Sequence, residues 1–117
     1  MQEAFVKALY ESIVKENLNL YKELYETTNV TSKTNEHWTQ AIDLYNNLDN
    51  EDKAVLFKII EQTMIDTISN MLGAIDGNST LKDFEAEPKL LLDSVDTEGE
   101  LQDYFLTFIE DKDKDAQ

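Results

Sequence analysis

The chain has 117 residues and no cysteine, and its 25 acidic and 10 basic residues give a formal charge of −15. This length suits a single domain with one core, and the lack of cysteine excludes disulfides, thiolate metal sites and thiol nucleophiles. All ten basic residues are lysine, so the bidentate arginine contacts that read phosphates and base edges are missing. We therefore expect no direct binding to nucleic acid.

No apolar run reaches the roughly 18 residues that a membrane span needs. Residues 1–20 lack the basic start and apolar middle of a signal peptide. A chain without cysteine also suits a reducing compartment. We expect a cytoplasmic protein that does not associate with membranes.

Residues 2–27 have the apolar spacing of an amphipathic helix. A tyrosine edge along one flank of its stripe is typical either of the rim of a core or of an exposed aromatic patch for a partner. Asn17 falls inside the stripe, where it is either hydrogen-bonded or marks a bend between two shorter helices. The stripe is expected to centre on Phe5, Val6, Leu9, Ile13, Leu20 and Leu24, flanked by Tyr10, Val14, Tyr21 and Tyr25.

A polar linker over residues 27–35 leads to a second helix, expected over residues 35–48 and including Trp38, Ile42 and Tyr45 at helical spacing. Only two or three residues then separate this helix from the next. Because such short connections favour antiparallel neighbours, we expect a helical hairpin with the first helix laid against it.

A long central helix is expected over residues 51–77, and the rest of the chain is expected to pack around it. Acidic and amide side chains at residues 49–52 suit its N-terminal end, and Gly77 suits a left-handed stop. Lys58, Gln62, Asp66, Ser69 and Asn70 form its expected polar face. The expected buried arc comprises Leu56, Phe57, Ile60, Met64, Ile68, Met71, Leu72 and Ile75.

Val55 and Ile59 do not fit the separation into a polar face and a buried arc, because they lie near the polar side of the central helix. An apolar residue on each side of a helix indicates cover on both sides. We therefore expect the first turns of the central helix to be covered all round.

Beyond Gly77 the helical spacing weakens. Residues 80–87 and 89–95 fit two short strands that turn near Pro88, and a short helix after Thr80 is the alternative. Thr97 and Glu100 have the spacing of a capping box, which predicts a last helix with an aromatic face docked on the central helix. After Ile109 we expect a solvated, frayed tail.

Candidate chemical sites are few. His37 is the one histidine, and without cysteine or a second histidine it does not form an ordinary zinc site. Asp111, Asp113 and Asp115 match the start of a calcium loop, but Ala116 stands where the loop needs glycine. With no phosphate-binding or nucleophile motif in the chain, we expect no enzyme, no cofactor and no metal site.

The expected fold is mainly α, with an α+β fold as the alternative: a small helical bundle around a long central helix, with a short β-hairpin near the C-terminus. Residues 1–110 form the expected single domain, and residues 111–117 form the acidic flexible tail. The candidate interaction surface comprises Tyr10, Tyr21, Tyr25, Val55, Ile59 and Asp66.

The leading hypothesis for function is a small acidic protein–protein interaction module, of the inhibitor or immunity type, that covers a basic surface of its partner. In a variant of it, the acidic side chains mimic a nucleic acid. The alternative is a structural homo-oligomer or assembly subunit, and a remote alternative is a carboxylate- or metal-dependent enzyme.

Overall fold

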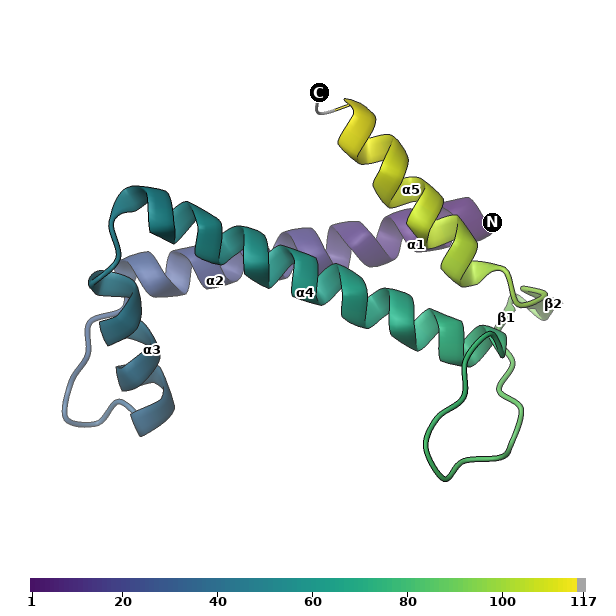
Figure 1. Ribbon diagram of the computed structural model, residues 1–117, viewed down its shortest axis with the longest axis horizontal. Coiled ribbons are helices and arrows are strands. Elements are labelled where there is room, and N and C mark those ends of the chain that lie inside the picture. The colour runs from purple at the N-terminus through teal and green to yellow at the C-terminus, as the bar shows by residue number, and fades with distance from the viewer. Residues whose placement is uncertain (116–117) are drawn as a thin grey trace.

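The computed structural model describes residues 1–115, which are mainly helical with a small antiparallel hairpin near the C-terminal end (Figure 1). The expected fold class is confirmed. In chain order the elements are α1 (Gln2–Leu9), the π-helical turn η1 (Tyr10–Lys15), α2 (Glu16–Thr27), α3 (Glu36–Asn46), α4 (Asn50–Asp76), β1 (Leu91–Leu92), β2 (Val95–Asp96) and α5 (Leu101–Asp115).

Helix α4 is the long central helix that the sequence predicts, and both of its ends have local causes. At the N-terminal end, Asp49 Oδ1 accepts a hydrogen bond from the backbone N–H of Asp52 at 2.8 Å, which satisfies one of the free donors of the first turn. At the C-terminal end, Gly77 takes a φ of 83°, a left-handed conformation that costs glycine little.

Helices α1 and α2 form one continuous rod through η1 (Figure 1). Val6, Tyr10, Val14 and Leu18 are buried at intervals of four residues along it. In an α-helix each such step overshoots a full turn by about 40°, so the row would drift around the axis. The wider turn of η1 takes up part of this overshoot. The rod therefore keeps all four side chains directed at the core.

The expected centre of the apolar stripe on this rod is correct at Val6, with Phe5 and Leu9 packed beside it, but wrong farther along. Tyr10 and Val14, expected on the flank, are buried, whereas Ile13 and Leu20, expected at the centre, are exposed. The prediction assumed 100° per residue throughout, and the π turn changes the phase of every later residue. Asn17 lies inside α2, so the rod has no break at that residue.

Two hydrophobic clusters lie along α4. The larger one joins the first part of the rod, the second half of α4 and the start of α5 (Figure 1). The smaller one joins α2, α3 and the first half of α4 around Leu18, Tyr45 and Phe57. The buried residues of the larger cluster are Val6, Tyr10, Val14, Ile65, Ile68, Leu72, Leu101 and Phe105.

The expectation of one core is therefore wrong, and the shape of the molecule shows why. Its radius of gyration is 17.8 Å, whereas a compact domain of this length has a value of about 13 Å. The principal extents are 49 × 39 × 23 Å. The two long helical rods cross obliquely, and α3 and α5 pack at different ends of them (Figure 1).

The buried arc of α4 is rotated from the expected one, because α5 docks on the side that carries Ser69. The Gln102 Nε2 atom donates to the Ser69 carbonyl oxygen at 3.0 Å and to the Ser69 hydroxyl at 3.3 Å. Gly73 permits this approach, since a Cβ atom there would lie 2.8 Å from Gln102 Nε2. Ser69, expected on the polar face, and Ile65 are thus buried, and Met71, expected in the core, is exposed.

Helix α3 begins at Asn35, whose Oδ1 accepts from the backbone N–H of Trp38 at 2.9 Å. It lies beside the C-terminal end of α2, steeply inclined to α4, and is not the antiparallel neighbour that the short connection suggested (Figure 1). Aromatic contacts hold it there. The Trp38 ring lies 6.3 Å from the Tyr21 ring and 6.0 Å from the Tyr25 ring, between ring centroids.

The hairpin exists, but its expected position is wrong. Strands β1 and β2 pair Leu91 with Asp96 and Leu92 with Val95, and the turn falls at residues 93–94 instead of at Pro88. Both turn residues have positive φ, 49° and 69°, as the turns that match strand twist require. Pro88 lies in the irregular segment of residues 77–90 that precedes the hairpin.

Helix α5 docks on α4 and also on α1, but the expected capping box at its start is wrong. Thr97 is buried, and its hydroxyl donates to the Leu90 carbonyl oxygen at 2.9 Å. Glu98 and Gly99 then take positive φ values of 57° and 68°. The helix consequently begins at Leu101, four residues after Thr97.

The acidic C-terminal segment was expected to fray after Ile109. Helix α5 instead continues to Asp115. The Lys112 Nζ atom lies 4.8 Å from the centroid of the Tyr10 ring, and its contact with the Tyr10 hydroxyl raises the pKa of Lys112. This contact ties the last turns of α5 to the rod. Ala116 and Gln117, also part of the expected tail, lie outside the described residues.

Candidate functional site

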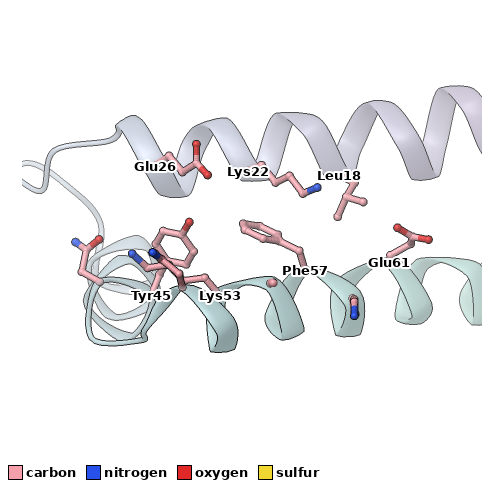
Figure 2. A pocket seen from close by; sticks show the side chains of 11 residues that line it. Leu18, Lys22, Glu26, Tyr45, Lys53, Phe57 and Glu61 are labelled. Carbon is pink, nitrogen blue, oxygen red and sulfur yellow. The ribbon is translucent and has the colours of Figure 1, made fainter.

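A groove of about 690 Å³ lies between α2 and the first half of α4 (Figure 2). Helix α2 contributes Leu18, Lys22 and Glu26 from one side, and Phe57 and Glu61 of α4 lie opposite them in Figure 2. The full lining is Leu18, Lys22, Glu26, Tyr45, Asn46, Asn50, Lys53, Ala54, Phe57, Lys58 and Glu61.

Two aromatic rings form the base of this groove, with a lysine near each. The Tyr45 and Phe57 ring centroids are 5.8 Å apart. The Lys53 Nζ atom lies 4.7 Å from the Tyr45 ring centroid, and the Lys22 Nζ atom lies 5.6 Å from that of Phe57. Contacts of this type are worth about 0.5–1 kcal/mol each at exposed sites. The Lys22–Phe57 contact therefore helps to hold α2 against α4, and the Lys53–Tyr45 contact helps to hold α3 against α4.

The electrostatics of the groove differ from those of the whole chain. Its three lysines and two glutamates give a net charge of +1, in a chain of −15. Burial raises the pKa of the Tyr45 phenol, and the Glu26 carboxylate adds to the rise. The groove is thus not the acidic surface that would meet a basic partner.

Within residues 1–115, no group of three or more histidine and acidic side chains is placed to hold a metal ion. His37 is exposed in the first turn of α3, and its ring centroid lies 5.5 Å from that of Trp38. Of the helices described, none is both long and apolar enough to cross a bilayer.

The three candidate tyrosines do not form one surface. Tyr10 is buried in the larger cluster, against Phe108 at a centroid distance of 5.6 Å. Tyr25 is partly buried in the smaller cluster, with its ring centroid 5.2 Å from that of Tyr45. Tyr21 is exposed at its edge but stacks on Trp38. Two of these rings therefore serve packing in different halves of the molecule.

Val55, Ile59 and Asp66 lie together on the outer side of α4. The expectation that the first turns of this helix are covered all round is wrong, because Val55 is 46% exposed and Ile59 is 57% exposed. Helix α2 covers the neighbouring side of α4, where Leu56, Ile60 and Met64 pack against the smaller cluster. The outer side has no neighbour among the described residues that buries these two side chains.

Val55 and Ile59 begin a longer row of exposed side chains at four-residue spacing, which we call the α4 ridge: Val55, Ile59, Thr63, Thr67 and Met71. Met71 is 59% exposed. The Thr63 hydroxyl donates to the Ile59 carbonyl oxygen at 2.8 Å, and the Thr67 hydroxyl donates to that of Thr63 at 2.7 Å. Both hydroxyl groups thus bond their own helix, and the ridge carries no charge because none of its five side chains is ionisable.

The α4 ridge is not predicted as a unit from the sequence. Met71 was expected in the core, and Thr63 and Thr67 were not among the candidate residues. The signal was nevertheless present, since residues four apart on a helix are neighbours on its surface. A polar row lies alongside the ridge and contains Lys58, Gln62, Asp66 and Asn70, within which Gln62 Nε2 donates to Asp66 Oδ1 at 2.9 Å.

The molecule exposes more surface than a monomer of its size usually does. Its accessible area is 8562 Å² for a mass of 13.5 kDa, whereas folded monomers of that mass expose roughly 6,500 Å². Exposed apolar residues outside the ridge also contribute to this accessible area. Leu81 and Phe84 of the segment 77–90, and Leu91 and Val95 of the hairpin, are each more than half exposed.

Comparison of the chain with models of protein families, with curated proteins and with solved structures finds no match.

Proposed function

We propose that this chain is an acidic protein–protein interaction module that binds a basic partner, acts without catalysis and is located in the cytoplasm. The observation that carries the proposal is the accessible area, which exceeds that of a compact monomer of the same mass by about 2,000 Å². A standard protein–protein interface removes roughly 800 Å² from each partner. An association of ordinary size would therefore bring the exposed area closer to the usual value.

The segment of residues 77–90 is the part best suited to a basic partner. Leu81 and Phe84 project from it as exposed apolar side chains, and Asp83, Glu85 and Glu87 lie on either side of Phe84. Interfaces commonly combine an apolar anchor with a charged rim. The complementary surface is an apolar pocket surrounded by lysine or arginine.

The charge of −15 supports the same partner chemistry. Opposite net charges speed the encounter of two proteins, and salt screens this attraction over a Debye length of about 8 Å at physiological ionic strength. Association with a basic partner should therefore slow steeply as salt rises. A phosphate-rich partner would meet repulsion instead.

The proposal is tested by affinity capture from a lysate of the organism that encodes the chain, at low and high salt. Three baits are compared: the unaltered chain, the double variant L81S/F84S, and the control V30S, which changes an exposed apolar residue of another irregular segment. We expect a basic protein that the unaltered chain and V30S recover at low salt and that L81S/F84S loses. Recovery of the same proteins by all three baits at both salt concentrations would overturn the proposal.

A second candidate function, self-association as a structural subunit, is favoured by a different observation. The α4 ridge is apolar and uncharged, so it has no acidic side chain for a basic partner to bind.

A further inference from the structure

We propose that the groove between α2 and α4 binds a free α-amino acid with an aromatic side chain. The carboxylate and the ammonium group of the ligand lie at one end of the groove, and its ring lies in the middle. At about 690 Å³, the groove falls in the usual size range of small-molecule sites, about 300–1,000 Å³. None of its lining residues belongs to the segment 77–90, so the inference does not depend on the basic partner proposed above.

The hydroxyl of Tyr45 is the first indication of a ligand. Tyr45 is only 4% exposed, and Figure 2 shows its hydroxyl pointing into the space between α2 and α4. Among residues 1–115, this hydroxyl has no hydrogen-bond partner. Buried polar groups nearly always have such a partner. For Tyr45 the partner has to come from the groove.

Lys53 supplies a positive charge beside this hydroxyl. Its Nζ atom lies 4.7 Å from the centroid of the Tyr45 ring, and the residue is partly buried. A carboxylate has two acceptor oxygens. One can accept from the ammonium group and the other from the phenol on the same ring, at the usual donor–acceptor distances of about 2.7–3.2 Å. This end of the groove therefore suits the carboxylate of a ligand.

Glu26 supplies a negative charge on the opposite wall. Figure 2 shows it on α2, across the groove from Tyr45, and its carboxylate is near enough to raise the pKa of that phenol. Within residues 1–115, Glu26 and Lys53 do not form an ion pair with each other. A zwitterion between them meets both charges, because its carboxylate accepts from Lys53 and its ammonium group donates to Glu26. A simple anion would be repelled by Glu26, and a simple cation by Lys53.

Apolar side chains line the middle of the groove, next to these charges. The Phe57 ring centroid is 5.8 Å from that of Tyr45, and Leu18 faces the groove from α2 (Figure 2). Aromatic rings pack against one another at centroid distances of about 4.5–7 Å. The ring of the ligand can therefore lie against Phe57 and Leu18 while its charged groups stay beside Tyr45.

The first test titrates L-phenylalanine into the ¹⁵N-labelled full chain and follows the amide chemical shifts. We expect saturable shifts along the walls of the groove, with a dissociation constant of about 1 mM, because so small a ligand gains only modest affinity. Three further probes each lack one part of the ligand. The probe 3-phenylpropionate lacks the ammonium group, 2-phenylethylamine lacks the carboxylate, and L-alanine lacks the ring. Each should bind at least about tenfold more weakly than L-phenylalanine.

The second test changes the groove. Tyr45→Phe removes one hydroxyl but keeps the ring, and Lys53→Gln removes one charge, so each should weaken the binding of L-phenylalanine about tenfold. Glu26→Gln should also weaken L-phenylalanine, but it should strengthen 3-phenylpropionate, because a repelling carboxylate is lost. The matched controls Glu23→Gln, on the same helix, and Lys33→Gln alter exposed residues outside the groove. Both should leave the dissociation constants within about twofold.

Two outcomes would overturn the amino-acid site. One is the absence of saturable shifts at the groove when L-phenylalanine reaches its solubility limit. The other is a Glu26→Gln variant that changes the affinities for L-phenylalanine and 3-phenylpropionate in the same direction, since only a zwitterion needs the acidic wall. Circular dichroism and the amide spectrum of each free variant check that the helices persist. The opposite response of the two probes to Glu26→Gln is a result that a loss of folding cannot produce.

Discussion

Asp76, the last residue of α4, closes the N-terminal end of α5: its Oδ2 atom accepts a hydrogen bond from the backbone N–H of Gln102 at 2.7 Å. The first turn of a helix leaves its backbone donors free, and a carboxylate satisfies such a donor while it also meets the positive end of the helix dipole. The cap here comes from another helix, 26 residues earlier in the chain. Stability of α5 is thereby coupled to the end of α4.

Asp76→Ala should lower the free energy of unfolding by about 1 kcal/mol, the usual cost of removing a capping side chain. Urea denaturation at neutral pH measures the change. Asp76→Asn retains an acceptor oxygen and should cost less than the alanine variant. If alanine and asparagine cost the same, the hydrogen bond to Gln102 does not stabilise α5.

Gly99→Ala should destabilise the protein more than Gly77→Ala. Both glycines have positive φ, 68° and 83°, which costs an L residue about 1–2 kcal/mol. A Cβ atom at Gly99 would also lie 2.8 Å from the Asp76 carbonyl oxygen, whereas nothing lies within 4 Å of one at Gly77. Paired thermal and urea denaturation of the two variants measures the difference. Equal losses of stability in the two variants would mean that the backbone at Gly99 moves away from Asp76 at little cost.

Asp96 should contribute stability at neutral pH that disappears in acid. The backbone N–H of Glu98 donates to Asp96 Oδ1 at 2.8 Å, and Lys89 Nζ lies 3.1 Å from Oδ2. The hydrogen bond first, and Lys89 second, hold the pKa of this carboxyl below its usual range. A group whose pKa is lowered by folding stabilises the folded state above its unfolded pKa, and the effect is lost as pH falls through the folded value.

The corresponding measurement compares Asp96→Asn with the unaltered chain by urea denaturation from pH 7 down to pH 2. The variant should be less stable at pH 7, and the difference should shrink as pH falls below about 4, the usual aspartate pKa, and disappear only below the lowered pKa of the folded state. Asp43→Asn, at an exposed position on α3, serves as the control. A constant difference across the whole range would contradict a role for the Asp96 charge.

Deletion of Ser12 should be tolerated better than deletion of Asn19. Ser12 lies in η1, where the wider turn accommodates more residues than an α-turn does, so that its removal can convert η1 into ordinary α-helix without turning the flanking residues away from the core. Removal of Asn19 from α2 would instead rotate the following residues by about 100°. Circular dichroism and urea denaturation measure the helix content and the stability of both variants. Equal losses of stability would contradict this account of η1.

The sequence predicts those parts of the fold that have local causes. The ends of α4 follow from Asp49 and Gly77, and the start of α3 follows from Asn35. These predictions succeed because a cap involves residues three or four apart. For the exposed side of α4 the sequence is less informative, because Val55, Ile59 and Asp66 were candidate surface residues but Val55 and Ile59 were also expected to be covered.

The remaining features depend on contacts between distant residues. The phase of the buried arc on α4 is set by Gln102, which lies 33 residues from Ser69, and no pattern within α4 reports it. The π turn changes the phase of the rod from Val14 onward, and its only trace in the sequence is a row of apolar residues four apart. The candidate tyrosines separate into different clusters because contacts between distant residues also decide where each of them packs.

The presence of two clusters along α4 implies that one helix spans two regions of different resistance to opening. The cluster along the second half of α4 contains eight buried residues, whereas the cluster along the first half contains three. Fluctuations that detach α3 should then expose the amide hydrogens of the first half to exchange while those of the second half stay protected, since opening free energies follow the local density of buried contacts. A partner that clamps the α3 end would slow that exchange without touching the region that α5 secures.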